Sequence, residues 1–307
     1  MHTDVGFNPI RIDEGLEYSL IVGSDGQMMK IDQDGSPCSP ISHPFPGASS
    51  CGVINSGRWI GSWTRRDLRK AFMGSFSLDE DWSNVNSDLG DIEEIGQGNP
   101  HVSKSSIWTR DLQSEPVAMC VVGDNTVFAC LGAGIYMIDS EAREIWRSPY
   151  PRWRELEDLV GMDSIVSIVH NEKEIYAFSS SGGFSIISVS SGHEVSNGIL
   201  SNLPGRLHDV KFERDSGWIV MLHGRNVVLL DDLLSKPEVL RVPGPVLDAS
   251  PVNGGWVWTG WRHDGISCAG TNEIHPREEI GVSLLGTKVL TNSGSWGNLP
   301  DSIRLKM

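Results

Sequence analysis

The sequence predicts an all-β protein, a single seven-bladed β-propeller of four-stranded antiparallel blades that spans residues 1–307. The first observation behind this prediction is that residues 117–148 read as four short apolar runs: VAMCVV, TVFACL, IYMID and EIWRS. Each run has the length of a strand, and each break contains the Gly, Asn or Asp that a tight antiparallel turn needs. This segment therefore predicts one four-stranded meander.

The second observation is that the second strand of this meander recurs along the chain. A meander buries one face at most, so it needs neighbours of the same kind. The recurring pattern is a turn residue, often an aromatic residue, and then a β-branched or aliphatic run. Its seven instances centre on Leu20, Ile60, Val127, Ile175, Ile219, Val257 and Val289. Most of the spacings lie near the roughly 40 to 50 residues of propeller repeats, so seven blades are predicted.

The first three blades follow in order. Blade one covers residues 10–42, with strands IRID, YSLIV and MMKID and a short fourth strand near Cys38. Blade two begins at Cys51, has KAFMGSF as its third strand, and ends with SSIWTR as its fourth. Blade three is the segment 117–148.

An acidic insert at about residues 79–98 lies within the second blade and accounts for the longest spacing. Residues 79–94 contain seven carboxylates and no basic residue. We interpret the insert as a solvated excursion or an interaction loop. We expect it to be mobile and to tolerate shortening without unfolding, because its charge offers little apolar area to offset ordering. A degenerate extra blade is the alternative.

Blades four to seven occupy the rest of the chain. Blade four has SIVSIVH, EIYAFS, FSIISVS and a strand after Gly192; blade five has LHDVKFE, WIVMLH, VVLLDD and EVLRV. Blade six has VLDAS, WVWTGW, ISCAG and NEIHP, and blade seven has GVSLL, KVLTNS and SIRLKM but no fourth strand. We expect residues 3–7 to supply that strand beside SIRLKM, because an unpaired sheet edge would otherwise remain. Residues 153–162 contain the one helical candidate.

Composition limits the classes of partner. The formal charge of -15 and the pI near 5.0 argue against broad binding to nucleic acid or to anionic membrane, since both attract basic proteins. No basic and apolar leader opens the chain and no apolar run reaches spanning length, so we expect a cytoplasmic protein. The five scattered cysteines then favour buried free thiols, with a Cys120–Cys130 disulfide or metal pair as the alternative.

Two blades carry a resemblance to a known family. The segment GDNTVFACLGAGIYMIDSEAREIWRS, and more weakly YSLIVGSDGQMMKIDQDG, resembles the repeat of quinoprotein-like (PQQ-repeat-like) propellers. WD-repeat propellers look similar, but no blade here ends in Trp-Asp. The resemblance implies a propeller fold in a family that contains quinone-dependent dehydrogenases and also non-catalytic assembly scaffolds. The fourth-strand Trp of the family recurs only as Trp108 and Trp146, so the resemblance supports the fold more than a cofactor.

Local motifs for catalysis or metal binding are weak. Asp32-Gln33-Asp34-Gly35 begins like a calcium loop, but Ser42 stands where the twelfth-position Glu is needed. The nine histidines form no His-x-His or HExxH pair, and no GxSxG elbow, P-loop or dinucleotide fingerprint occurs. The sequence therefore predicts no catalytic residue, no metal and no cofactor. A site assembled from histidines of several blades is the alternative.

The loops carry the best candidate site. In a propeller, the loops between second and third strands lie on the same face as the connections between blades. The former contain Arg65, Arg66, His223, Arg225, Trp261, Arg262, His263 and Trp296; the latter add His43, Arg152, Trp153, Arg154 and Arg277. The opposite face receives Asp13, Glu14, Asp32, Asp34, Glu141, Asp231, Asp232 and the insert. One face is thus expected to be acidic and the other rich in Arg and Trp, the residues enriched at binding hot spots.

These features predict a non-catalytic propeller scaffold that binds a protein or peptide partner, an acidic one in the first instance, through the Arg- and Trp-containing loops. The alternative is an enzyme of the lactonase, sugar-acid or quinone-dependent dehydrogenase kind, with its site at the channel mouth. A small-molecule sensor or a structural subunit of a larger assembly is the third hypothesis. The simplest account of the loop residues is that they are solvated and balanced by neighbours such as Asp67 and Asp264.

Overall fold

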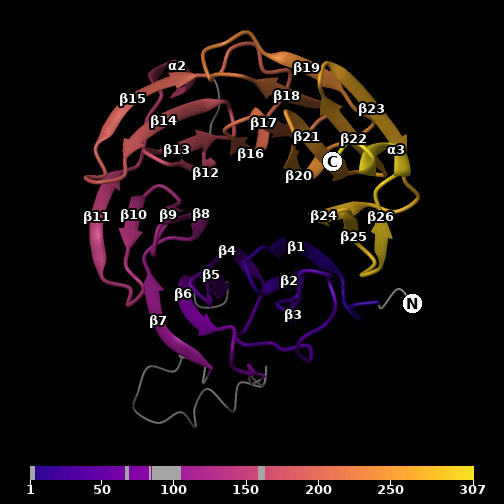
Figure 1. Cartoon of the computed structure of the whole chain (residues 1–307). Helices are drawn as coiled ribbons and strands as arrows, with labels where there is room; N and C mark the ends of the chain where they lie inside the picture. Colours follow the sequence, from indigo (N-terminus) through magenta and orange to yellow (C-terminus); the bar gives the residue numbers. More distant parts are fainter. Residues whose placement is uncertain (1–3, 66–68, 83, 85–104, 158–162) are drawn as a thin grey trace, which may run out of the picture. The chain divides into compact units, whose positions relative to one another are not determined.

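The computed structural model describes residues 4–65, 69–82, 84, 105–157 and 163–307. Its strands form seven consecutive antiparallel sheets, five with four strands and two with three. The fold is a seven-bladed β-propeller, as predicted (Figure 1). The chain divides into two compact units, residues 10–149 and residues 1–9 with 150–307. The assignment of the whole chain to one domain stays a prediction.

The N-terminal unit, residues 10–149, contains three blades. The first is β1 (Pro9–Asp13), β2 (Ser19–Gly23) and β3 (Met28–Ile31). The second is β4 (Ser49–Asn55), β5 (Arg58–Arg65), β6 (Lys70–Ser77) and β7 (Ser106–Leu112). The third is β8 (Pro116–Val122), β9 (Asn125–Cys130), β10 (Gly134–Ile138) and β11 (Glu144–Pro149). The meander that began the prediction is therefore confirmed, and so is SSIWTR as a fourth strand.

The C-terminal unit contains the other four blades. Blade four is β12 (Ile165–Asn171), β13 (Glu174–Ser179), β14 (Gly183–Ser188) and β15 (Glu194–Ile199), and blade five is β16 (Leu207–Glu213), β17 (Gly217–Leu222), β18 (Asn226–Leu230) and β19 (Glu238–Arg241). Blade six is β20 (Val246–Val252), β21 (Gly255–Gly260), β22 (His263–Cys268) and β23 (Thr271–Pro276). Blade seven is β24 (Gly281–Leu285), β25 (Lys288–Thr291) and β26 (Trp296–Asn298). The short helix α2 (Arg154–Glu157) precedes β12, inside the predicted helical segment.

The first blade lacks the fourth strand that was predicted near Cys38. Isolated bridges, Ile31 to Pro37 and Met28 to Ser42, replace it. The reason lies in the segment PCSPISHP, which carries three prolines. A proline has no N–H to donate to a ladder, so this segment pairs only at single points.

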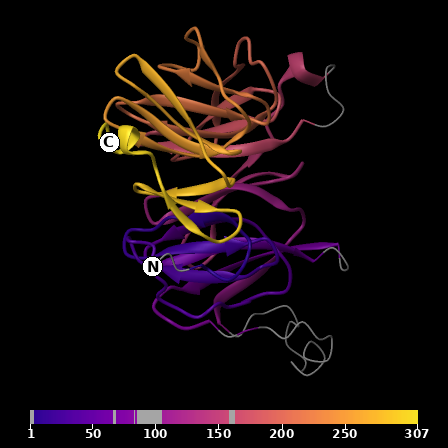
Figure 2. The same cartoon turned by 90° about the vertical axis from the view of Figure 1, so that its right-hand side faces the viewer.

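The pairing of N- and C-terminal strands was predicted wrongly. The segment SIRLKM, residues 302–307, does not form a strand. It begins within the helix α3 (Asp301–Arg304), which lies against the strands of the last blades (Figure 2). Pro300 precedes this helix, where its fixed φ is tolerated, and Asp301 complements the helix dipole. The third strand of the blade is β26 instead.

The N-terminal segment still contacts the last blade, through one backbone hydrogen bond. Val5 donates its N–H to the carbonyl oxygen of Gly294 at 3.0 Å, in the turn between β25 and β26. Gly294 has a φ of +89°, and a Cβ atom there would lie 2.8 Å from the carbonyl oxygen of Phe7. Only glycine fits this contact, and Val5 and Phe7 are both buried beside it.

The second strands carry most of the core. β2 and β21 are buried along their whole length, whereas the outer strand β15 is largely exposed. The tryptophans expected in second strands, Trp59, Trp218, Trp256 and Trp258, are all buried. Aromatic rings therefore fill the space between neighbouring blades, as the sequence predicted.

Only the start of the acidic insert belongs to the described residues. Trp82 is buried, and its ring lies 5.2 Å from that of Phe76 and 6.0 Å from that of Trp59. The segment is therefore anchored into the aromatic core of blade two before it continues. Residues 83 and 85–104 lie outside the described residues, and with them the predicted mobility of the insert.

A repeated hydrogen bond fixes the turn after the second strand in five blades. The residue that follows the strand donates its N–H to the carbonyl of a residue in the connection that leads into the blade. The pairs are Leu131 with Glu115, Ser180 with Ser164, His223 with Arg206, Trp261 with Pro245, and Asn292 with Ile280. These turns and the blade connections thus lie side by side, which is the arrangement that the loop prediction required.

The cysteine thiols are free. Cys120 lies opposite Val127, and Cys130 lies opposite Pro116, so the two are offset by about 10 Å along the ladder at roughly 3.3 Å per residue. That register excludes a disulfide between them. Burial raises the pKa of Cys130 to about 12, whereas Cys38, contrary to the expected burial, is exposed. None of the helices among the described residues has the length and apolar character to span a membrane.

Candidate functional site

The turn between β21 and β22 presents the most exposed of the predicted aromatic residues. Trp261 is 53% exposed, although the strands on both sides of it are buried. Its N–H donates to the carbonyl of Pro245 at 2.9 Å, and a Cβ atom built on Gly244 would lie 2.7 Å from Cβ of Trp261. The backbone of Trp261 is therefore tied to the connection between blades five and six, and its side chain packs against Gly244.

Arg262 completes this turn in a strained backbone conformation. Its φ is +59°, a region that residues other than glycine rarely adopt. Its carbonyl accepts the N–H of Arg277 at 2.9 Å, and its Nε donates to the carbonyl of Glu278 at 2.9 Å. Hydrogen bonds thus tie the turn to the connections on both sides of blade six. The side chain of Arg262, whose backbone is strained, is exposed in this turn.

The equivalent turn of blade five contains His223 and Arg225, both exposed. Partial desolvation of the ring, followed by the charges of His208 and Arg206, lowers the pKa of His223, and its ring lies 5.2 Å from that of His208. The carbonyl of Arg225 accepts the N–H of Val242 at 2.9 Å. Residues 242–245 therefore bond Arg225 at one end and Trp261 at the other, so one connection links the two turns.

The remaining predicted site residues lie elsewhere. His263 is the first residue of β22 and is fully buried, and Trp296 is the first residue of β26 rather than a turn residue and is also buried. Arg65 ends β5 in the N-terminal unit, and Arg66 lies outside the described residues. The connection 242–245 thus links the turn of Arg225 and the exposed His223 to the turn of Trp261, in which Arg262 follows and is also exposed.

Several other loop residues have structural roles. Trp153 is buried and donates its Nε1–H to the carbonyl of Phe184 at 2.9 Å, and Arg277 forms an ion pair with Asp264. Asp13, expected on the acidic face, is buried and accepts a 2.7 Å hydrogen bond from Nε1 of Trp59. Side-chain type and loop class therefore overestimate the number of solvent-facing charges.

His263 gives a test by pH. Its Nδ1 lies 3.1 Å from the carbonyl oxygen of Trp261, and burial lowers its pKa below the ordinary value, although Asp264 opposes this. The unfolded chain therefore binds this proton at a higher pH than the folded chain. We expect stability to be greatest above about pH 6.5 and to fall on acidification, as urea unfolding at pH 7.5 and 5.5 would measure. The free energy of unfolding of His263→Phe should fall less between pH 7.5 and 5.5 than that of the unaltered protein. An equal fall in both proteins would contradict the prediction.

The calcium-like sequence at Asp32 is a turn. Oδ1 of Asp32 accepts the backbone N–H groups of Asp34 and Ser36 at 2.9 and 2.8 Å. Asp139 does the same in blade three, with the N–H groups of Glu141 and Arg143. This is the local hydrogen bonding by which Asp stabilises turns. Within the described ranges, no group of three or more His, Cys, Asp or Glu side chains is placed to hold a metal ion.

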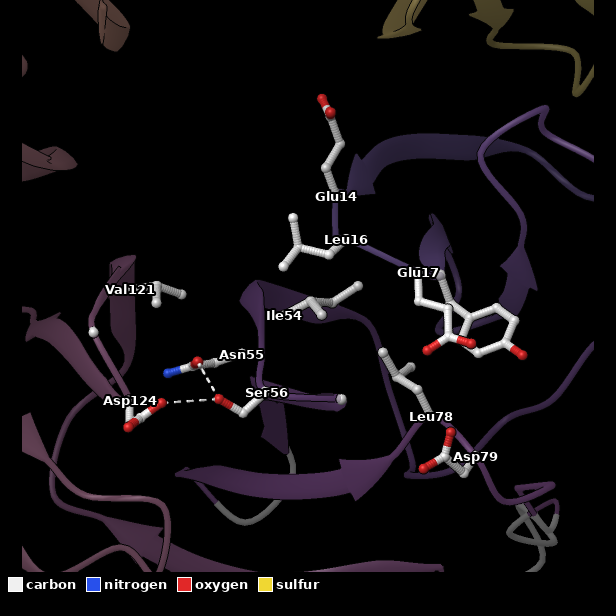
Figure 3. Close-up of a pocket in the computed structure, with 14 residues that line it drawn as sticks. Glu14, Leu16, Glu17, Ile54, Asn55, Ser56, Leu78, Asp79, Val121 and Asp124 are labelled. Carbon is white, nitrogen blue, oxygen red and sulfur yellow. Dashed lines mark hydrogen bonds between the residues drawn. The ribbon is translucent and has the colours of Figure 1, made fainter.

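A second candidate site lies in the N-terminal unit and was not predicted. A depression of about 810 Å³ is formed by the loops between first and second strands of its three blades, together with residues after β6 (Figure 3). Glu14, Glu17, Asp79 and Asp124 supply carboxylates to its lining. Glu14 was expected on an acidic face, but the depression was not predicted, because the loops that form it come from three blades.

Comparison with known proteins adds no family assignment: the chain matches no protein-family model, and it matches no curated protein sequence.

Proposed function

We propose that the chain is a non-catalytic propeller scaffold that binds an acidic peptide segment of a protein partner through Arg225, Trp261 and Arg262. The observation that carries this proposal is the exposed side chain of Trp261, which packs against Gly244 while the backbone N–H of Trp261 bonds the carbonyl of Pro245. A large aromatic side chain in water is of no use to the core, and a fixed one loses little entropy when a partner covers it. Trp and Arg are also the residues that dominate binding hot spots.

The charge of the turns favours an acidic partner. Arg225 and Arg262 are both exposed. The carbonyl of Arg225 bonds the connection to which Trp261 is tied, and Arg262 follows Trp261 in its turn. Arg262 uses its Nε for the carbonyl of Glu278, which orients the guanidinium. A planar, oriented guanidinium next to an aromatic face suits a carboxylate followed by an apolar side chain. The lactonase-like or dehydrogenase-like enzyme stays an alternative prediction.

A peptide selection tests this proposal without knowledge of the natural partner. A library of random dodecapeptides is selected on the protein, and the affinities of recovered peptides are measured by fluorescence anisotropy. We expect acidic peptides, and we expect Trp261→Ala to weaken them by about 2 kcal/mol, which is roughly 30-fold. Arg262→Glu should weaken them more than Arg262→Gly, and both losses should become smaller as salt rises.

The variants also separate binding from folding. Arg262→Gly suits the backbone at positive φ, so the melting temperature should not fall. Leu234→Ala is the matched control, because Leu234 is an exposed apolar residue of the same unit in a loop of the opposite class. Selected peptides that bind the double variant of Trp261 and Arg262 as tightly as the unaltered protein would exclude this surface.

A further inference from the structure

We propose that the depression in the N-terminal unit is a docking site for a basic peptide segment of a partner, one that carries two Lys or Arg residues around an apolar residue. This site is distinct from the Arg225, Trp261 and Arg262 surface and does not depend on it. It lies among loops of the other class, in the other unit, and its charge is of the opposite sign.

Part of the lining of the depression is apolar. Leu16 is fully exposed on the loop between β1 and β2, and in Figure 3 its side chain extends toward the space between Ile54 and Val121. Leu78 lies beyond Ile54, near Asp79, and is itself buried in the core of blade two (Figure 3). Burial of a leucine side chain is favourable, and the side chain of Leu16 is left in water. An apolar residue of a partner that covers Leu16 would recover that free energy.

The carboxylates lie on opposite sides of the apolar part of the lining. Figure 3 shows Asp124 on one side, and Glu17 and Asp79 on the other. All three are exposed, and no Lys or Arg is among the described residues that line the depression. A ligand that spans the depression would therefore need positive charge at both ends and apolar character between them. A second copy of this chain, with its net charge of -15, is a poor match for such a site.

One of these carboxylates is held in position. The hydroxyl of Ser56 lies 3.2 Å from Oδ1 of Asp124 and 3.0 Å from Oδ1 of Asn55 (Figure 3). Nδ2 of Asn55 donates in turn to the carbonyl of Asn125 at 3.2 Å. Side chains thus join the hairpin turns of blades two and three. The side chain of Asp124 is already partly ordered, so it loses less conformational entropy when a ligand binds.

The size of the depression favours a peptide over a simple amine. A volume of about 810 Å³ holds several side chains, and much of its lining is apolar rather than charged. A polyamine would satisfy the carboxylates but would leave Leu16, Ile54 and Val121 uncovered. A segment with the pattern basic, apolar, basic satisfies both parts of the surface.

The test uses fluorescein-labelled nonapeptides with two Lys or Arg residues around one Leu, Ile or Phe, and the whole protein. Binding is measured by fluorescence anisotropy at 50 and 300 mM NaCl. We expect Asp124→Asn and Glu17→Gln each to weaken the best peptide three- to tenfold, and Leu16→Ser to do the same at both salt concentrations. Asp25→Asn removes one charge from an exposed turn outside the depression and should leave the affinity unchanged.

Each other outcome overturns the proposal. Equal weakening by Asp25→Asn and Asp124→Asn would mean that the peptide senses only the net charge of the protein. Binding that is insensitive to Leu16→Ser, or spermine bound more tightly than every peptide, would replace the peptide with a bare cation. No binding of any basic peptide would exclude the site, whereas loss of binding by Trp261→Ala would assign the peptide to the other surface.

Discussion

Replacement of Asp264 by alanine is expected to lower the free energy of unfolding by about 3 to 5 kcal/mol, the cost of removing one partner of a buried ion pair. The side chain of Asp264 is 2% exposed and that of Arg277 is 11% exposed, and Nη2 of Arg277 lies 2.6 Å from Oδ2 of Asp264. Asp264 also accepts a 2.8 Å hydrogen bond from Oγ1 of Thr259, and Arg277 reaches the carbonyl of Asn298 at 3.0 Å. Asp264→Ala leaves the hydroxyl of Thr259 and the guanidinium of Arg277 buried without the carboxylate that they bond.

Urea unfolding of Asp264→Ala measures this loss. An exposed ion pair of the same unit, Arg214 with Glu172, provides the control, and Arg214→Ala should change stability by less than about 1 kcal/mol. The double replacement of Asp264 and Arg277 by leucine should cost less than the sum of the single replacements, because neither charge is then left alone. A change below 1 kcal/mol for Asp264→Ala would show that the pair does not hold blades six and seven together.

Ile303→Ala is expected to cost about 2 to 5 kcal/mol, as truncation of a buried isoleucine does when the cavity does not collapse. Ile303 lies on α3 and is fully buried in a cluster with residues of the last two blades, among them Val257, Leu284 and Leu299. The same helix approaches β23, where Ser302 Oγ lies 3.1 Å from Nε2 of His275. The helix α3 therefore covers the core of the last blade, where a further strand was expected.

Leu305 provides a matched control two residues further along. It is 88% exposed, so Leu305→Ala should leave the unfolding midpoint unchanged. If both substitutions had the same small effect, α3 would be a loosely attached end and the core of the last blade would be complete without it.

The regular blades could be predicted because their sequence is locally consistent. In blade three, each apolar run is bounded by turn residues such as Gly123 and Gly132, and both adopt positive φ in the structure. Turn chemistry and strand pattern then indicate the same four strands. The irregular ends could not be predicted this way. The prolines beyond β3 reduce a strand to single bridges, and Pro300 starts a helix in a segment whose alternating apolar residues suggested a strand.

The candidate site was predicted by loop class and only partly by residue. The N–H of Trp261 and the carbonyl of Arg225 bond the same connection, as expected of equivalent turns in neighbouring blades. His263 and Trp296 carry the same residue types but are the first residues of strands and are buried. A shift of one or two positions at the end of a strand decides which side a residue faces, and sequence patterns place strand ends least reliably. The acidic depression escaped notice because it exists only once three blades are placed side by side.

The contact between Val5 and Gly294 has a consequence for synthesis on the ribosome. The two residues are bonded to each other but are far apart in the chain, and at about 5 to 20 residues per second Gly294 is made roughly 15 to 60 s after Val5. The N-terminal unit has its own strands early, whereas the C-terminal unit includes residues 1–9 and is incomplete until its last blade emerges. During that interval the apolar side chains of Val5 and Phe7 are without their final neighbours, so the first residues to be made are among the last to be packed.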